Sequence, residues 1–125
     1  MNFPNSNYAQ LYIRQRPYGN LEPSSSNNQI IQNSHNLCTY YQNRNKFKET
    51  FECDQYFDYS TKQEELYDIV AKPIVTSALL GYSGTILAYG PTSSGKTFTM
   101  RGGEEDSTKG IIPRFVYTTD IVDHI

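Results

Sequence analysis

The eight residues GPTSSGKT constrain this chain more than any other feature, because they fit the pattern G-x-x-x-x-G-K-[ST] at every defined position. They are Gly90, Pro91, Thr92, Ser93, Ser94, Gly95, Lys96 and Thr97. The apolar run TILAY at residues 85–89 precedes them and predicts a strand buried on both faces of a sheet. Phe98-Thr99-Met100 follows and predicts the start of a helix. Such a loop between strand and helix is typical of α/β domains.

The residue types in this loop suit the binding of phosphate groups. Its two glycines let the backbone curl, so that successive N–H groups point inward. Lys96 places a point charge between the β- and γ-phosphates, and the Thr97 hydroxyl enters the shell of a Mg²⁺ ion. Pro91 donates no N–H, which is tolerable early in the loop. The loop predicts a site for a nucleoside triphosphate with Mg²⁺; the alternative is an ordinary glycine turn between strand and helix.

The segment before residue 60 predicts β structure. Residues 9–16 alternate in polarity and predict a strand that Pro17 ends. Two short apolar clusters within residues 29–45 predict a weak hairpin, and residues 46–57 predict a further strand. Residues 1–8 have the composition of a flexible tail.

A helix of about five turns is predicted between residue 60 and Gly81. Ser60-Thr61-Lys62-Gln63 has the pattern of a capping box, and Gly81 stands where a helix ends in a left-handed residue. Pro73 removes the amide bond back to Ile69 and should kink the helix. The residues expected on its buried face are Leu66, Ile69, Val70, Pro73, Ile74, Ser77 and Leu80.

The residues after the loop predict a polar connection at 102–110 and a last helix opened by Ile112-Pro113. The residues expected on the buried face of this helix are Phe115, Val116, Thr119, Val122 and Ile125. The order of strand, strand, helix, buried strand, glycine loop and helix resembles the opening of a three-layer α/β domain.

Composition excludes several classes of function. The chain has 125 residues, one domain's worth, and its net charge of −2 with no basic stripe argues against nucleic acid or an anionic membrane as a partner. No run of 18 apolar residues predicts a membrane span, and the N-terminus lacks the features of a secretory signal. Cys38 and Cys53 predict two free thiols in a reducing compartment. His35 and His124 receive no role.

Arg14-Gln15-Arg16-Pro17 puts two guanidinium groups at the end of a strand, beside a rigid ring. From the residues alone, we favour a solvated pair of arginines on a strand edge. The alternative is a platform for a flat base, because guanidinium groups stack well on aromatic rings.

Several motifs together resemble the kinesin motor domain. The phosphate loop with its flanks (AYG, then SSGKTFTM) and the helix opening GIIPR resemble the family's ATP-binding segment. IRQRP is similar to its R-x-R-P strand end, FECDQYFD to a further strand, and QEELYDIVAKPIV to the helix before the loop. The resemblance covers about residues 9–125 and implies a three-layer P-loop NTPase fold with a central β-sheet and flanking helices.

The resemblance also implies roles. Arg14, Arg16 and Pro17 would line the adenine pocket, Phe98 would pack near the base, and residues 90–97 would bind the phosphates of ATP with Mg²⁺ at Thr97. Pro91 stands where the family usually has Gln. The implied activity is ATP hydrolysis coupled to movement along microtubules, in the cytoplasm on the cytoskeleton.

The family's switch segments, N-x-x-S-S-R-S-H and D-L-A-G-S-E, do not occur in this sequence. We therefore expect residues 9–125 to be a partial motor domain truncated after the P-loop helix, with no catalytic residue of its own and poor solubility. The alternative is a non-hydrolysing nucleotide binder or a non-functional truncated product. A generic P-loop kinase or GTPase is disfavoured, because no Walker-B or guanine-reading motif is present.

Overall fold

The computed structural model divides into two compact units, Met1–Tyr59 and Ser60–Ile125, and each is described by itself. The described residues are 9–17, 28–34, 36–42 and 47–122. The tail predicted at residues 1–8 lies outside them.

In the first unit, the strand predicted at residues 9–16 forms over a shorter range. Strand β1, Tyr12–Arg14, pairs in parallel with strand β5, Gln55–Phe57. The Gln15 N–H donates to the Phe57 carbonyl at 2.8 Å and extends the pairing by one bond. The ring of Phe57 is almost fully buried, so this short two-stranded sheet is fixed by side-chain burial as well as by its ladder.

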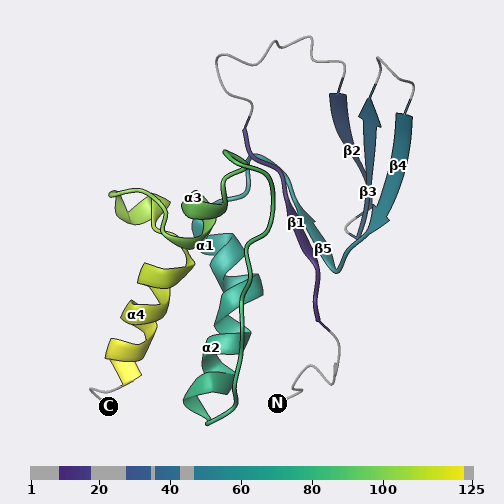
Figure 1. The fold of residues 1–125 in the computed structure, drawn as a ribbon. Coiled ribbons are helices and arrows are strands. Elements are labelled where there is room, and N and C mark those ends of the chain that lie inside the picture. Colours follow the sequence, from purple (N-terminus) through teal and green to yellow (C-terminus); the bar gives the residue numbers. More distant parts are fainter. Residues whose placement is uncertain (1–8, 18–27, 35, 43–46, 123–125) are drawn as a thin grey trace. The chain divides into compact units, whose positions relative to one another are not determined.

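The predicted hairpin is confirmed and is part of a three-stranded antiparallel sheet (Figure 1). Its strands are β2, Asn28–Ser34; β3, Leu37–Gln42; and β4, Phe47–Glu52. The prediction of a single strand at residues 46–57 is wrong, because the segment forms two strands, β4 and β5, with a break in the strand pairing between them. Asp54 lies at the break, where its N–H donates to the Leu11 carbonyl at 2.7 Å and its carboxylate accepts from the Leu11 N–H at 2.6 Å. These bonds to another part of the chain replace the β4 ladder.

Both cysteines lie in the core of this unit as free thiols, as predicted. Cys38, Cys53 and Tyr56 form one buried cluster, and Ile13 packs against it. Burial raises the pKa of the Cys38 thiol and, with smaller contributions from Cys38 and Asp54, also that of Cys53. A buried, protonated thiol is a poor nucleophile.

Neither native thiol should therefore react readily with a disulfide reagent. At pH 8 we expect Cys38 and Cys53 of the native chain to react slowly with a chromogenic disulfide. Once urea unfolds the chain, both thiols should react at the rate of a cysteine in an unstructured peptide. Ser83→Cys, at an exposed position, serves as the reactive control. Fast labelling of the native chain without Ser83→Cys would show that the cluster is not a packed core.

In the second unit, the predicted long helix forms as three consecutive segments. They are α1, Gln63–Leu66; a π-helical turn η1, Tyr67–Ala71; and α2, Lys72–Leu79. The Lys72 N–H donates to the Tyr67 carbonyl, five residues back. The helix does change at Pro73, and the form of the change is a wide turn just before the proline. Such a turn relieves the crowding between the proline ring and the preceding carbonyls.

The buried face of this helix differs from the predicted one. Gln63, Tyr67, Ala71 and Val75 are buried at intervals of four residues, whereas only Leu66 of the predicted set is fully buried. Leu80, expected on the same face, is exposed. After Tyr67 the wide turn explains the difference, because one added residue rotates every later side chain by about 100° around the axis.

The prediction for the start of this helix is wrong, and the prediction for its end is confirmed. The predicted capping box is wrong: the N-cap position is Lys62, it makes no side-chain cap, and Gln63 is already inside the helix. At the other end Gly81 adopts φ 91°, as predicted for a left-handed terminator. The Gly81 N–H donates to Ala78 at 2.9 Å and the Tyr82 N–H to Ser77 at 3.1 Å, which is the bonding of a Schellman motif.

The buried strand predicted at residues 85–89 does not form. After α2 the chain reverses and continues without regular secondary structure (Figure 1). At the reversal Gly84 lies so close to Ile74 that a Cβ on the glycine would be 2.4 Å from the Ile74 Cγ2 methyl group. Leu87 is 84% and Tyr89 96% exposed. A strand exists only within a hydrogen-bonded ladder, and no residue in the described part of the chain pairs with this segment.

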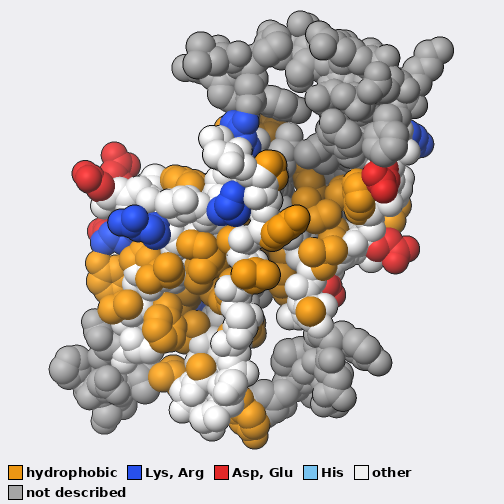
Figure 2. Space-filling view, in the orientation of Figure 1, with side chains coloured by type: hydrophobic (Ala, Val, Ile, Leu, Met, Phe, Trp, Pro, Cys, Tyr) orange, Lys and Arg blue, Asp and Glu red, His pale blue; other side chains and the backbone are white. Residues whose placement is uncertain are grey.

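The last elements are α3, Lys96–Met100; a 3-10 turn η2, Asp106–Thr108; and α4, Ile111–Val122. The start of α4 agrees with the predicted opening, but Phe115 and Val116 are 40% and 46% exposed instead of buried. Hydrophobic side chains gather over α4 on the face seen in Figure 2, so this face lacks a cover among the described residues. None of the described helices has the length and apolar character needed to cross a membrane.

The exposed apolar segment should make the chain self-associate. Replacing Leu87 and Tyr89 together by lysine removes two exposed apolar side chains and adds charge, so we expect concentration-dependent light scattering to fall. Ser83→Lys with Thr85→Lys is the matched control, because it adds the same two charges at exposed positions and removes no apolar side chain. A wild-type chain that sediments as a compact monomer at every concentration would contradict the expectation.

Candidate phosphate-binding loop

The loop at residues 90–97 folds as a tight curl at the start of α3. Gly90 and Gly95 have φ of 153° and 100°, and Ser93, with φ 63°, adopts a left-handed conformation that is uncommon without glycine. The Ser94 N–H donates to the Pro91 carbonyl at 3.2 Å and closes the turn. Alternation of left-handed and other conformations directs successive N–H groups toward one concave side. This geometry suits an anionic ligand.

Lys96 reaches back across the curl. Its ammonium donates to the carbonyls of Gly90 at 2.8 Å and Pro91 at 2.7 Å. An ammonium has three N–H donors, so one remains without a protein acceptor among the described residues. The positive charge is thereby fixed at the mouth of the loop, where the predicted phosphates would approach.

Two residues of the loop have roles that their side chains alone do not reveal. A Cβ at Gly90 would lie 2.7 Å from the Ser94 hydroxyl, and residues with a side chain rarely adopt its φ of 153°, so this position favours glycine. Pro91 contributes its carbonyl, which accepts from both Lys96 and Ser94. Its missing N–H therefore removes a possible donor and leaves the internal bonding of the loop intact.

The first turn of α3 supplies further backbone donors. Its N-cap is Gly95, and no side chain caps the helix there. The N–H groups of a helix's first turn have no partner within the helix, so they can face a ligand. Thr97 is exposed on this turn, next to Lys96, and Phe98 is exposed one residue further along. Backbone N–H donors and an exposed hydroxyl therefore lie within one short segment, as the predicted binding of phosphate and Mg²⁺ requires.

Arg14, Arg16 and Pro17 belong to the first unit and lie together at the end of β1. Arg14 is half-buried, and burial lowers the pKa of its guanidinium from the ordinary value. Arg16 and Pro17 are exposed, and the Arg16 guanidinium donates to the Pro17 carbonyl at 3.3 Å. Between the two arginines, Gln15 accepts a hydrogen bond from the buried Tyr56 hydroxyl. The prediction that both arginines are exposed to solvent fits Arg16 better than Arg14.

The connection between α3 and α4 is closed by its own side chains. Lys109 lies 2.8 Å from an Asp106 carboxylate oxygen and donates to the Tyr117 hydroxyl at 2.6 Å. These bonds raise the pKa of Lys109, and the bond from Lys109 lowers that of Asp106. The Arg114 guanidinium donates to the Lys109 carbonyl at 3.0 Å. The cations here are engaged within the protein, so this cluster is structural.

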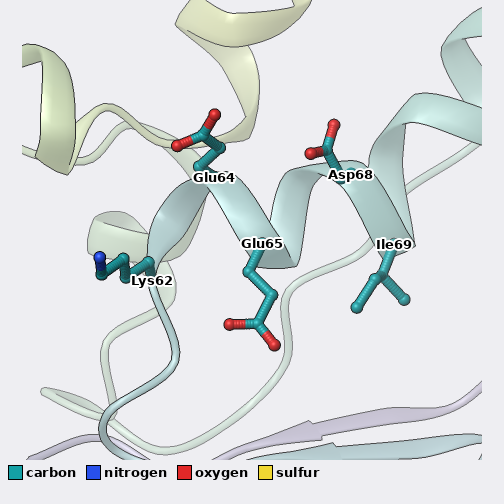
Figure 3. Close-up of a pocket in the computed structure, with 5 residues that line it drawn as sticks. All are labelled: Lys62, Glu64, Glu65, Asp68 and Ile69. Carbon is teal, nitrogen blue, oxygen red and sulfur yellow. The ribbon is translucent and has the colours of Figure 1, made fainter.

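A hollow beside α1 has the wrong charge for phosphate (Figure 3). Glu64, Glu65 and Asp68 line it together with Lys62 and Ile69. Glu64 and Asp68 point to one side of the helix and Glu65 to the other, so the carboxylates do not converge. No group of acidic, His or Cys side chains in the part of the chain that the structure describes could hold a metal ion.

Sequence reasoning missed one residue that contacts the helix of the loop. The sequence pattern predicts a capping-box role for Gln63, whereas its buried side-chain amide donates to the carbonyls of Phe98 and Thr108. The available signal is its spacing: Gln63 stands four residues before Tyr67, in register with the buried positions of the helix.

Comparison with known proteins identifies relatives over nearly the whole chain. The family model for the kinesin motor domain matches residues 14–124. Kinesin heavy chain of Syncephalastrum racemosum is 38% identical over 112 residues, which cover 88% of this chain and 12% of that protein. Kinesin heavy chain of Drosophila melanogaster is 56% identical over 73 residues, 58% of this chain and 7% of that protein.

A solved structure is also similar. It is that of a fast kinesin, described for its implications for ATPase mechanism and interactions with microtubules. The match has a TM-score of 0.76 at 34% sequence identity and covers 91% of this chain. This chain spans 33% of that kinesin chain and about a tenth of the curated relatives it matches. The predicted P-loop NTPase fold class is thus confirmed for the part that is present.

Proposed function

The chain belongs to the kinesin motor domain family, and we propose that it forms the ATP-binding part of a kinesin-like microtubule motor. The observation that carries this proposal is the curl at residues 90–97, with the Lys96 ammonium bonded to its carbonyls at the mouth. One cation and a set of convergent backbone donors suit a polyphosphate. The acidic hollow beside α1 does not.

Within this proposal each loop residue has a task. The backbone N–H groups bind phosphate oxygens, and Lys96 donates to the β- and γ-phosphates. The Thr97 hydroxyl would hold Mg²⁺, which would supply positive charge to offset that of the phosphates. The proposed nucleotide-binding set is Gly90, Pro91, Thr92, Ser93, Ser94, Gly95, Lys96, Thr97, Phe98, Arg14, Arg16 and Pro17.

The proposal also assigns residues to the adenine base of the nucleotide. The partly buried guanidinium of Arg14 and the rigid ring of Pro17 suit a flat base. Phe98 presents an exposed aromatic ring on α3, two residues after Lys96. A ring at that position packs on the base without adding charge.

Hydrolysis is assigned to the complete motor, which moves along microtubules in the cytoplasm. Phosphoryl transfer needs groups that orient the attacking water, and we assign no catalytic residue to residues 9–125. The absence of both switch segments from this sequence favours a second candidate, a nucleotide binder that does not hydrolyse ATP. The reading frame downstream of Ile125 separates the two, because only the motor requires both switch segments.

Binding of Mg·ATP to the 125-residue chain tests the loop directly. We expect saturable binding by equilibrium dialysis and a loss of at least about tenfold in affinity for Lys96→Met, because a hydrogen bond to a charged group contributes about 1.5–3 kcal/mol. Lys62→Met is the matched control: it removes the same charge from an exposed position outside the loop. Absence of Mg·ATP binding by the wild-type chain at millimolar concentration would sink the proposal.

The motor assignment is tested in a polypeptide that carries this chain together with both switch segments. We expect its ATPase rate to rise when microtubules are added and to be lost on Lys96→Ala, since the lysine charge stabilises the transferring phosphoryl group. A microtubule-stimulated rate that Lys96→Ala leaves unchanged would exclude this loop as the ATPase site.

A further inference from the structure

Gln63 is a buried polar residue outside the phosphate loop, yet it bonds to the helix that carries the loop's lysine. The side chain is 4% exposed. Its amide nitrogen donates to the Phe98 carbonyl at 2.6 Å and to the Thr108 carbonyl at 3.1 Å. It therefore joins three segments of the second unit: α1, α3 and the end of η2.

The Phe98 carbonyl can accept from Gln63 because α3 is short. In a longer helix the N–H of Gly102 would donate to Phe98, four residues back. Here that N–H donates to Thr97 instead, at 3.4 Å, and the Arg101 N–H also donates to Thr97, at 2.8 Å. The helix thus ends by turning the Phe98 carbonyl toward α1, where Gln63 meets it.

The second acceptor fixes the connection that follows α3. The Thr108 carbonyl also accepts from the Gly103 N–H at 3.1 Å, and the Gly110 N–H donates to the Arg101 carbonyl at 3.0 Å. These bonds close residues 101–110 into a compact loop. Through Thr108, Gln63 ties the closed end of that loop to α1.

Only a neutral side chain with two N–H donors satisfies both carbonyls without burying a charge, and glutamine is of this kind. A carboxylate of the same shape would place acceptors against acceptors. A methionine of similar length would donate to neither carbonyl, so both would lose the hydrogen bond from residue 63. The residue type therefore matches the geometry closely.

We propose that Gln63 is a positioning residue for the nucleotide loop, and this inference rests on the proposed function. Phe98 lies two residues after Lys96 on one short helical segment. Lys96, Thr97 and Phe98 lie within about one turn of the same backbone, so a displaced Phe98 carbonyl shifts the backbone that carries Lys96 and Thr97. Hydrogen bonds weaken steeply as their geometry is distorted, so a small displacement of these donors weakens their bonds to a ligand.

The test compares two variants that each remove buried hydrogen bonding from the second unit. Tyr67→Phe, the control, removes the 2.7 Å bond between the Tyr67 and Thr118 hydroxyls and leaves α3 untouched. We expect Gln63→Met to weaken Mg·ATP binding by about tenfold or more, and Tyr67→Phe to leave it unchanged. Amide exchange at residues 102–110 should accelerate in Gln63→Met alone. Urea midpoints show whether a general loss of stability explains the difference.

The possible outcomes separate the two proposals. If the wild type binds Mg·ATP and Gln63→Met binds as tightly as Tyr67→Phe, the role of Gln63 is overturned and the nucleotide site stands. If the wild type binds no Mg·ATP, the nucleotide site itself fails, and the role of Gln63 fails with it. Should Gln63→Met not fold, Gln63→Asn, whose amide is one methylene too short to reach both carbonyls, is measured against Tyr67→Phe in the same way.

Discussion

The candidate site depends on a helix that is too short to be stable alone. Helix α3 has five residues, whereas isolated helices shorter than about 12–15 residues are marginal in water. It nevertheless carries Lys96 and Thr97. Its order comes from contacts on either side: the curl that ends at Gly95, and the Gln63 amide at its carbonyl end. The geometry of a phosphate site here is therefore a tertiary property, although its residues are contiguous in sequence.

This explains which parts could be predicted from the sequence. The curl at residues 90–97 and the terminator Gly81 follow from glycine chemistry within a few residues, and both form. The strand at residues 85–89 and the burial of Phe115 are wrong, because each needs a neighbour that the described residues do not supply. A local apolar pattern predicts that a segment is buried, but it does not identify the element that buries it.

The helix before the loop shows a second kind of failure, in which one local rule displaces another. Gln63 fits a capping box by spacing, yet the helix starts at Gln63 itself and the side chain turns inward to two carbonyls. Pro73 predicts a kink, and the wide turn η1 takes its place while rotating the buried face. In both cases the sequence identifies the position of an irregularity and tertiary bonding decides its form.

The charge of the chain determines which kind of interaction could bring a polyphosphate to the loop. The chain has a net charge of −2, and acidic side chains line the hollow beside α1, so no broad positive field draws a polyphosphate to this protein. Recognition must then come from short-range donors: one ammonium bonded to loop carbonyls and the backbone N–H groups of the curl. Short-range donors act only when correctly placed, because hydrogen bonds weaken steeply as their angles depart from linear. The backbone conformation of residues 90–97, and the contacts that hold α3 behind it, therefore matter more for binding than the number of positive charges.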